Sequence, residues 1–219
     1  MRKVCHLAGL FWVWYNESGL ARNIVKMKIT VYLGSSFGND PIYKENIIEL
    51  GHWLAKQKHQ LIYGGSKDGL MGILADTVLA DGGEVYGIIP LDFKKREKAH
   101  LHLTELTVVA DMDERKRLLM DNGELFLAFP GGPGTLEEIV QAFSWARIGL
   151  HHKPCLFLNL NGYYNPLKAL FDQMVTTEFL RQEDRDKAIF VDDLKALQEF
   201  VKAYQREEND RFQSFICKR

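Results

Sequence analysis

From Met27 onward, short apolar runs alternate with longer segments of helical periodicity, and this alternation constrains the fold more than any other feature. The apolar runs have the length of buried strands, and each intervening segment has the length of a single helix. This order is typical of βαβ units that stack around a parallel sheet. The sequence therefore predicts one α/β domain, a Rossmann-like doubly wound parallel sheet flanked by helices.

The expected elements follow one another with few long connections. Strands are expected at 29–33, 60–63, 85–89, 106–110, 125–129, 155–158 and 188–191. Helices are expected at 41–58, 69–81, 112–122, 135–150, 163–179 and 193–204. The polar, basic loop at 91–103 is long for a connection in such a domain, so it is a candidate active-site lid.

The first 26 residues differ from the rest of the chain. Arg2 and Lys3 precede an apolar run that is too short to cross a bilayer. That run is only weakly similar to a secretory signal, because no clear small-residue cleavage site follows it. We expect an extension outside the fold at 1–26, a domain at 27–205 and a polar tail that frays at 206–219. A peripheral packing element and an export signal are the alternatives for the extension.

Charge and cysteine content exclude several classes of function. The net charge of −1 provides no electrostatic footprint for nucleic acid or for an anionic membrane. Cys5, Cys155 and Cys217 lie too far apart to suggest a metal site or a disulfide framework. We therefore expect a cytoplasmic protein whose partner is a small molecule, without nucleic-acid or membrane partners.

Three glycine clusters follow predicted strands, at 34–38, 64–72 and 131–134. Open parallel sheets bind ligands beyond the carboxyl ends of their strands, and glycines let backbone N–H groups approach an anion there. Three clusters on one edge predict a pocket. The alternative for each cluster is a tight turn that needs positive φ and holds no ligand.

The familiar nucleotide-binding motifs are absent from these turns. The first strand is not followed by G-x-G-x-x-G, and no acidic residue ends the second strand to hold a ribose, which disfavours a dinucleotide. The sequence G-x-x-x-x-G-K-[ST] occurs nowhere, which disfavours a P-loop enzyme. The segment from Gly131 to Thr135 suits a single phosphate, because close backbone approach, a hydroxyl and a helix start coincide there.

Two charged residues lie where chemistry could occur. Glu138 is expected in the first turn of the helix after the third glycine cluster, near the strand ends. Its alternative is a capping box in which Glu138 reaches back to the amide of Thr135. Arg115 lies in the first turn of another predicted helix, where a cation is unfavourable unless it meets an anion. Its alternative is a solvated helix end.

Ordered motifs give the chain a resemblance to the Lonely Guy family, many members of which carry the older label "possible lysine decarboxylase". The string Pro130–Glu138 matches the family's PGGxGTxxE, and Met112–Lys116 resembles its M-x-x-R-K. Tyr63–Gly72 resembles YGGG-x-x-GLMG, with Ser66 where a third glycine is usual. Segments 34–36 and 87–90 also fit, so the resemblance covers about 27–204.

The resemblance implies a cytokinin riboside 5′-monophosphate phosphoribohydrolase that needs no metal or organic cofactor. Such an enzyme cleaves the N-glycosidic bond of a cytokinin riboside 5′-monophosphate or AMP to free base and ribose 5-phosphate. It implies Arg115 and Glu138 as the catalytic pair and a homodimer, with helix residues Ala142, Phe143 and Trp145 as a candidate interface. The substrate-binding residues expected from the resemblance and from the glycine clusters together are Glu97, Lys116, Gly131, Gly132, Gly134, Thr135, Ser144, Gly34, Ser35, Gly64 and Gly65.

The physical chemistry of these residues is compatible with that reaction. Glycosidic cleavage passes through an oxocarbenium-like ribose, which Glu138 can stabilise while it orients or deprotonates a water. Arg115 can offset the charge that develops on the leaving base, or clamp the substrate. Phe37, Phe143 or Trp145 are candidates for contact with the base, while His100 and His102 are expected to be surface residues.

Two other functions compete with hydrolysis. A lysine decarboxylase needs a Schiff-base lysine, and Lys67, Lys116 and Lys153 are candidates only because they lie near strand ends. A non-catalytic nucleotide-binding module could use the same glycine turns. Glu138 together with Arg115 favours the enzyme, because a phosphate site has no use for an added carboxylate.

Overall fold

The computed structural model describes residues 26–95 and 98–217, with side chains described up to 207. The predicted extension therefore lies outside the described residues, apart from Lys26. Within the described ranges, seven parallel strands form a single sheet. The strands are β1 (Lys28–Tyr32), β2 (Gln60–Tyr63), β3 (Glu84–Pro90), β4 (Glu105–Val109), β5 (Leu125–Ala128), β6 (Cys155–Leu158) and β7 (Ala188–Val191).

The strand order is β4-β3-β2-β1-β5-β6-β7, which confirms the predicted doubly wound fold. The chain first builds outward from β1 to β4 and then returns to add β5 on the other side of β1. Thr30 of β1 is in register with Ile62 of β2 on one side and with Phe126 of β5 on the other. The order reverses between β1 and β5, and ligands bind at such a point in open parallel sheets.

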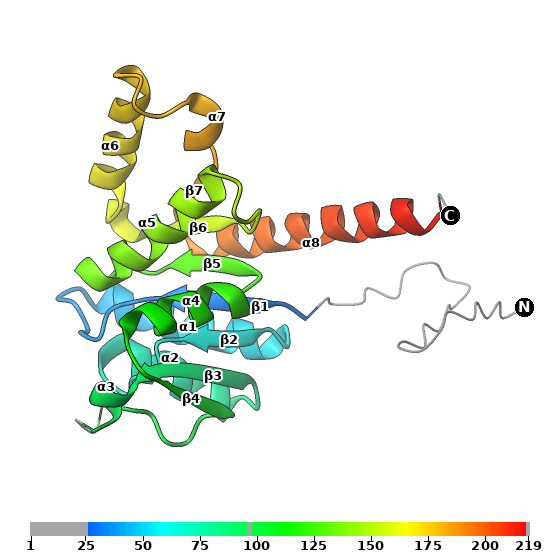
Figure 1. The fold of residues 1–219 in the computed structure, drawn as a ribbon. Coiled ribbons are helices and arrows are strands. Elements are labelled where there is room, and N and C mark those ends of the chain that lie inside the picture. Colours follow the sequence, from blue (N-terminus) through cyan, green and yellow to red (C-terminus); the bar gives the residue numbers. More distant parts are fainter. Residues whose placement is uncertain (1–25, 96–97, 218–219) are drawn as a thin grey trace, which may run out of the picture.

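Helices cover both faces of this sheet (Figure 1). They are α1 (Pro41–Lys56), α2 (Gly69–Ala80), α3 (Leu91–Lys95), α4 (Met112–Asn122), α5 (Pro133–Arg147), η1 (Leu160–Gly162), α6 (Asn165–Thr176), α7 (Gln182–Arg185) and α8 (Leu194–Cys217). Asp40 caps α1 by accepting from the Ile42 amide at 3.0 Å, and Pro41 is the first helical residue.

Alternate residues of each strand enter different cores. Ile29 and Val31 of β1 belong to the cluster that contains apolar residues of α1, α2 and α8. Tyr32 belongs to the cluster on the other face, with residues of α4, α5 and α6. Thr30 lies on that second face too, where its hydroxyl donates to the Leu119 carbonyl of α4 at 2.9 Å. This period of two places both layers of helices against buried strands.

Several boundaries differ from the sequence-based expectations. The loop at 91–103 begins as the short helix α3, and Ala99 forms an isolated antiparallel bridge with Ser66. Helix α7 was not predicted. Helix α8 continues to Cys217 instead of ending at 204, and Figure 1 shows it extending past the edge of the sheet. None of the helices in the described ranges combines the length and apolar character that a bilayer crossing needs.

Candidate active site

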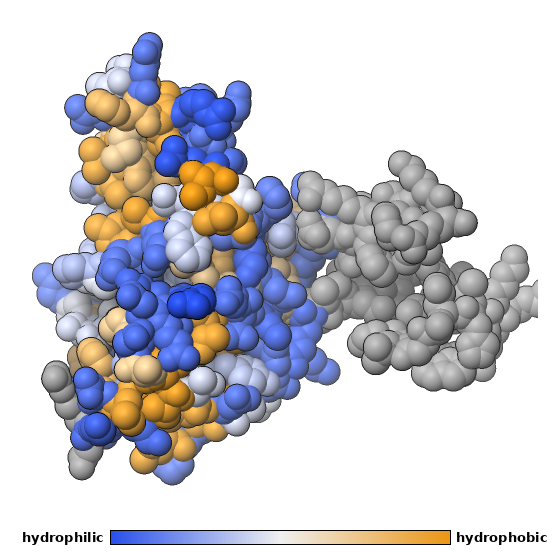
Figure 2. Space-filling model, viewed as in Figure 1, coloured by the Kyte–Doolittle hydropathy of each residue, from blue (hydrophilic) through white to orange (hydrophobic). Residues whose placement is uncertain are grey.

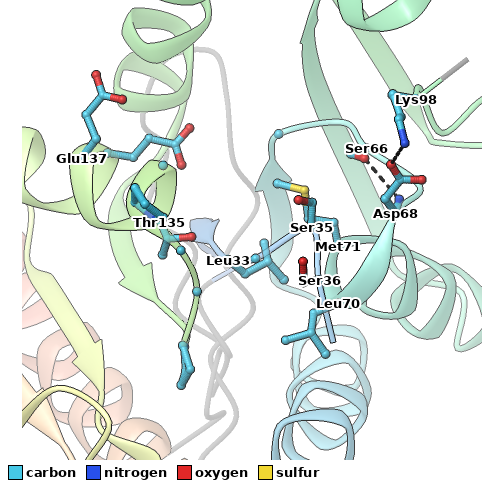
Figure 3. Close-up of a pocket in the computed structure, with 18 of the residues that line it drawn as sticks. Leu33, Ser35, Ser36, Ser66, Asp68, Leu70, Met71, Lys98, Thr135 and Glu137 are labelled. Carbon is cyan, nitrogen blue, oxygen red and sulfur yellow. Dashed lines mark hydrogen bonds and ion pairs between the residues drawn. The ribbon is translucent and has the colours of Figure 1, made fainter. Parts of the chain in front are cut away.

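The three glycine turns line one cavity of about 680 Å³ beyond the carboxyl ends of the strands, as the sequence predicts. Gly34 contributes from the turn after β1, Gly64 from the turn after β2, and Gly131 from the turn after β5. Figure 3 shows Thr135 and Glu137 on one wall and Asp68 and Lys98 on the opposite wall. The cavity therefore opens where the strand order reverses.

Close backbone packing explains some of these glycines. A Cβ placed on Gly131 would lie 2.8 Å from the Gly34 amide nitrogen, so the first and third turns touch through bare backbone. Gly69 has φ +57, and a Cβ there would overlap the Ser35 carbonyl. These positions need glycine for the protein's own packing, whether or not a ligand binds.

Gly132 and Gly134 need glycine for no such reason, because a Cβ on either would meet nothing within 4 Å. Both face the cavity at the start of α5, for which Gly132 is the N-cap. The N–H groups of Gly132, Gly134 and Thr135 have no acceptor in the part of the chain that the structure describes. Free N–H groups at a helix N-terminus, beside open space, form a site for an anion.

Glu138 and Arg115 meet at the inner end of this cavity. Nη1 of Arg115 donates to Oε1 of Glu138 at 2.7 Å, and Nε donates to the Ile88 carbonyl at 3.0 Å. Each of the two charged residues is only 8% exposed, and both line the cavity. The two structural alternatives from the sequence, a solvated helix end for Arg115 and a capping box for Glu138, are both wrong. Arg115 is buried, and Glu138 does not cap its helix.

The capping box is wrong because α5 starts earlier than predicted. Pro133 occupies the first helical turn and Gly132 is the N-cap, so Thr135 already lies inside the helix. Glu138 is therefore a full turn from the helix start, and its carboxylate points toward Arg115 rather than toward a free amide.

Burial raises the pKa of Glu138 above its ordinary value, and the nearby Arg115 guanidinium opposes that rise. Burial also raises the pKa of Tyr32 well above its ordinary value, and the negative charge of Glu138 adds to the effect. Tyr32 thus stays protonated beside the carboxylate. Glu138 is thus a buried carboxylate whose charged form is disfavoured by burial and favoured by the Arg115 guanidinium.

Gly64 lines the cavity and also makes room for Arg115. A Cβ at this position would overlap Nη2 of Arg115, and it would lie 2.8 Å from the Met71 methyl carbon. The missing side chain therefore makes room for the guanidinium. Gly65, which was expected to bind substrate, does not line the cavity; it adopts φ +74 and packs against Ile88 and Ile89.

Other expected substrate contacts lie away from the cavity. Lys116 does not line it, and its ammonium binds Glu137 at 2.9 Å and Asp113 at 3.4 Å. Ser144 is six residues further along α5 and does not line the cavity, since about 100° of rotation per residue places it on a different face of the helix from Glu138. Glu97 lies outside the described residues. Ser35 and Thr135 line the cavity as predicted.

Of the three aromatic residues expected to contact the base, only Phe37 lines the cavity. Phe37 lines the cavity and is 56% exposed at its mouth. Phe143 is buried in the core, where it stacks on Phe171 at 5.1 Å between ring centroids, and it does not reach the cavity. Trp145 packs against the same core. Phe37 alone of the three keeps its expected place.

His100 corrects another expectation, because it is buried rather than at the surface. Its Nε2 lies 2.9 Å from Asp76 Oδ1, and its Nδ1 accepts from the His102 amide at 3.3 Å. His102 is exposed, as expected. Among the described residues, no three His, Cys, Asp or Glu side chains gather closely enough to hold a metal.

Sequence reasoning missed several residues that line the cavity. They include Tyr43, Asp68, Phe93, Lys98, Met112, Glu137 and Tyr163. Tyr163 could have been found by the rule that located the glycine turns, because it follows the carboxyl end of β6, the strand beside β5. Most of the others lie in segments that the sequence had already singled out, but no local pattern showed that these particular side chains face the cavity.

Comparison with known proteins gives consistent matches across this domain. The family model described as "Possible lysine decarboxylase" matches residues 71–201. A cytokinin riboside 5′-monophosphate phosphoribohydrolase from Rhodococcoides fascians is 40% identical over 168 residues, which cover 76% of this chain and 85% of that protein. One of the same name from Arabidopsis thaliana is 37% identical over 180 residues, covering 82% and 83%.

A solved structure of similar fold is the molybdenum cofactor carrier protein from Chlamydomonas reinhardtii. Its TM-score is 0.63 at 18% sequence identity, covering 81% of this chain and 97% of that one. A molybdenum cofactor binding protein from Rippkaea orientalis gives a TM-score of 0.60 at 19% identity, covering 82% and 98%. At these identities the likeness concerns the fold alone.

Proposed function

This chain belongs to the Lonely Guy family, the family labelled "possible lysine decarboxylase", and from that premise we propose how Arg115 and Glu138 carry out its reaction. The enzyme hydrolyses the N-glycosidic bond of a nucleoside 5′-monophosphate to free base and ribose 5-phosphate, the activity for which its relatives are named. Cytokinin riboside 5′-monophosphates and AMP are the proposed substrates. One observation carries the residue assignment: a buried carboxylate borders a cavity that also contains free N–H groups.

The 5′-phosphate binds at the start of α5. The N–H groups of Gly132, Gly134 and Thr135 donate to it, and the helix dipole favours its negative charge. Binding the phosphate there holds the ribose next to Glu138, one helical turn further along α5. Energy from a group that does not react is thereby used to position the bond that breaks.

Cleavage then needs a negative charge beside the ribose. As the bond between C1′ and the base nitrogen lengthens, positive charge develops on C1′ and the ring oxygen, and the Glu138 carboxylate stabilises it. A water adds its oxygen to C1′, and Glu138 accepts the proton that this water loses. The departing base takes the electron pair of the broken bond and a proton from solvent.

Arg115 has a different role from the one expected from the sequence. Its guanidinium already donates to Glu138 and to the Ile88 carbonyl, so its charge is directed at the carboxylate rather than at a leaving base. We assign it the task of holding Glu138 in place and keeping it ionised. This matters because burial alone would favour the protonated acid, which could neither stabilise the ribose nor accept a proton.

The competing functions fit the site less well. None of the three lysines considered for a decarboxylase, Lys67, Lys116 and Lys153, is among the described residues that line the cavity. A pure nucleotide-binding module would gain nothing from a buried carboxylate near the phosphate, since like charges repel. Lysine decarboxylation and simple binding are both disfavoured on these grounds.

We propose a homodimer and a cytoplasmic location, and the interface differs from the expected one because Ala142 and Phe143 are buried in the chain's own core. Figure 2 shows exposed apolar side chains over α6 and near the end of α5. Those exposed at the end of α5 and around α6 are Ile148, Leu150, Leu170 and Phe179.

We also propose that the domain is self-sufficient from Met27. Met27 is only 5% exposed, its amide donates to Nδ1 of His59, and its carbonyl accepts from the Gln60 amide. A chain that starts there keeps the bond to the Met27 carbonyl, and its terminal amine can still donate to Nδ1 of His59. Such a chain should fold and retain activity.

A panel of nucleoside 5′-monophosphates tests the proposed function. Purified protein is incubated with AMP, N6-isopentenyl-AMP, CMP and UMP, and the released base and ribose 5-phosphate are quantified. The proposal expects equal amounts of the two products from a purine substrate. Binding of AMP without release of adenine would instead identify a nucleotide-binding module.

A further inference from the structure

Two consecutive tyrosines hold the glycine turn that is proposed to bind phosphate. The Tyr164 hydroxyl donates to the Phe129 carbonyl at 2.9 Å, and the Tyr163 hydroxyl donates to the Gly131 carbonyl at 2.5 Å. Both tyrosines follow η1, which comes after β6, whereas the turn follows β5. Since β5 and β6 are neighbours in the sheet, the two segments meet beyond the strand ends.

The two hydroxyls are placed differently. Tyr164 is 4% exposed and packs edge-on against Phe157, so it anchors the start of the turn inside the core. Burial raises the pKa of Tyr164 above its ordinary value, which keeps its phenol able to donate. Tyr163 is 42% exposed, lines the cavity and makes an edge-to-face contact with Tyr43 on the opposite side of the rim.

The segment that carries the tyrosines is itself fixed by polar contacts. Oδ1 of Asn159 accepts from the Tyr164 amide at 2.7 Å, and Nδ2 donates to Asn165 at 2.9 Å and to Asp192 at 3.2 Å. Asn161 adopts φ 50, and its amide group donates to Asp40 at 3.3 Å. The segment that carries Tyr163 is therefore fixed by side-chain hydrogen bonds on both sides of the tyrosine.

The hydrogen bond from the Tyr163 hydroxyl to the Gly131 carbonyl fixes the orientation of the peptide group between Gly131 and Gly132. In a planar trans peptide, the carbonyl of one residue and the N–H of the next point in opposite directions. Fixing the Gly131 carbonyl therefore fixes the N–H of Gly132, which has no acceptor among the described residues.

We propose that Tyr163 is a positioning residue for phosphate, acting through the Gly131 carbonyl, and that Tyr164 anchors the same turn from inside the core. The proposal rests on the proposed function in one respect, the binding of a 5′-phosphate at this turn. It assigns Tyr163 no part in bond cleavage. Loss of its hydroxyl should weaken binding of every phosphorylated ligand and leave the chemical step largely unchanged.

Tyr163→Phe tests this, with Tyr86→Phe as the matched control. Tyr86 loses the same hydroxyl, but its partners are Glu84 and Gln60 at the amino ends of β2 and β3, away from the cavity. For Tyr163→Phe we expect KM for AMP to rise about tenfold, which corresponds to about 1.4 kcal/mol, while kcat changes less than threefold. Tyr86→Phe should match the wild type.

Ligand binding distinguishes positioning from general damage to the pocket. Inhibition constants are measured for ribose 5-phosphate, inorganic phosphate and adenine. Tyr163→Phe should weaken the first two about tenfold and leave adenine unchanged. Equal weakening of all three ligands, or a fall in kcat at constant KM, would overturn the proposal.

A failure of the proposed function would look different. If the wild type releases no base from any monophosphate, thermal stabilisation by ribose 5-phosphate still tests the tyrosine. A smaller shift in Tyr163→Phe than in the wild type supports the positioning role without catalysis, and equal shifts refute it. Because Tyr163 is half-exposed, Tyr163→Phe should melt close to the wild type without ligand.

Discussion

Arg115 and Glu138 form a buried ion pair that joins the two halves of the doubly wound sheet. Arg115 lies on α4, which follows β4 at one edge, while Glu138 lies on α5, which follows β5 on the other side of β1. Their side chains meet at 2.7 Å where the strand order reverses. Burying two charges is costly unless they are paired and hydrogen-bonded, and the proposed reaction gives this pair a reason to be buried beside the cavity.

Glu138→Gln should fold and lose activity. The glutamine oxygen can still accept from Arg115, which limits the cost of leaving that buried cation without a counter-charge, so the protein should fold with only a modest fall in melting temperature at pH 7. Turnover should drop by about 10²–10⁴-fold, because an amide cannot accept a proton from water. Released adenine and thermal unfolding measure the two effects. Lower stability with normal activity would show that Glu138 is structural.

Arg115→Met should shift the acidic limb of the pH–rate profile to higher pH. Burial already raises the pKa of Glu138 and Arg115 opposes that rise, so removing the cation raises this pKa further. Activity that needs the carboxylate is lost as pH falls through its pKa, and the loss should therefore begin at a higher pH in the variant. The measurement is kcat across pH 4–9, and an unshifted limb would contradict the assigned role.

The same substitution should destabilise the protein only while Glu138 can ionise. Breaking a buried pair leaves an uncompensated charge and costs on the order of 3–5 kcal/mol. In a Glu138→Gln background no charge is left behind, so Arg115→Met should cost much less there. A double-mutant cycle by urea unfolding measures the coupling. Additive effects of the two substitutions would show that the pair contributes nothing to folding.

The sequence predicted the fold and much of the site, because both depend on local patterns. Apolar periodicity located the strands, and the position of glycines after strand ends predicted the pocket before any geometry was known. The site predictions that failed depend on the rotational phase of a helix or on contacts between residues far apart in the sequence. The predicted start of α5 was two residues too late, which led to the capping-box alternative for Glu138. The prediction for Ser144 did not take account of the helix rotation that places its side chain away from the cavity. His100 was predicted wrongly because its partner, Asp76, lies on α2 and is 24 residues away in the sequence.

Glycines in the site should respond to substitution in opposite ways. Gly64→Ala should reduce activity by displacing the guanidinium, because its Cβ would overlap Nη2 of Arg115, and it should lower the melting temperature as well. The loss should be visible in kcat, since Arg115 holds Glu138. Unchanged kcat with unchanged stability would mean that Arg115 moves without consequence.

Gly134→Ala provides the contrasting case. No protein atom lies within 4 Å of a Cβ there, and alanine is the better helix former, so stability should stay constant or rise by up to about 1 kcal/mol. The new methyl group enters space proposed for phosphate, so KM for AMP should rise. Stability and KM are measured on the same preparation. A normal KM would place the phosphate elsewhere in the cavity.

His59 should make the protein less stable in mild acid. Burial lowers the pKa of His59 from 6.5 to about 4, and its Nδ1 accepts from the Met27 amide at 3.3 Å. Between these two values the unfolded chain binds a proton that the folded chain does not. The stabilisation from neutral His59 is therefore complete above pH 6.5 and is lost as pH falls toward 4, by roughly 3 kcal/mol. Urea unfolding from pH 7 to pH 4 should show this fall, and His59→Asn, whose amide oxygen can still accept from Met27, should flatten it. An equally steep fall in the variant would assign the acid sensitivity to other groups.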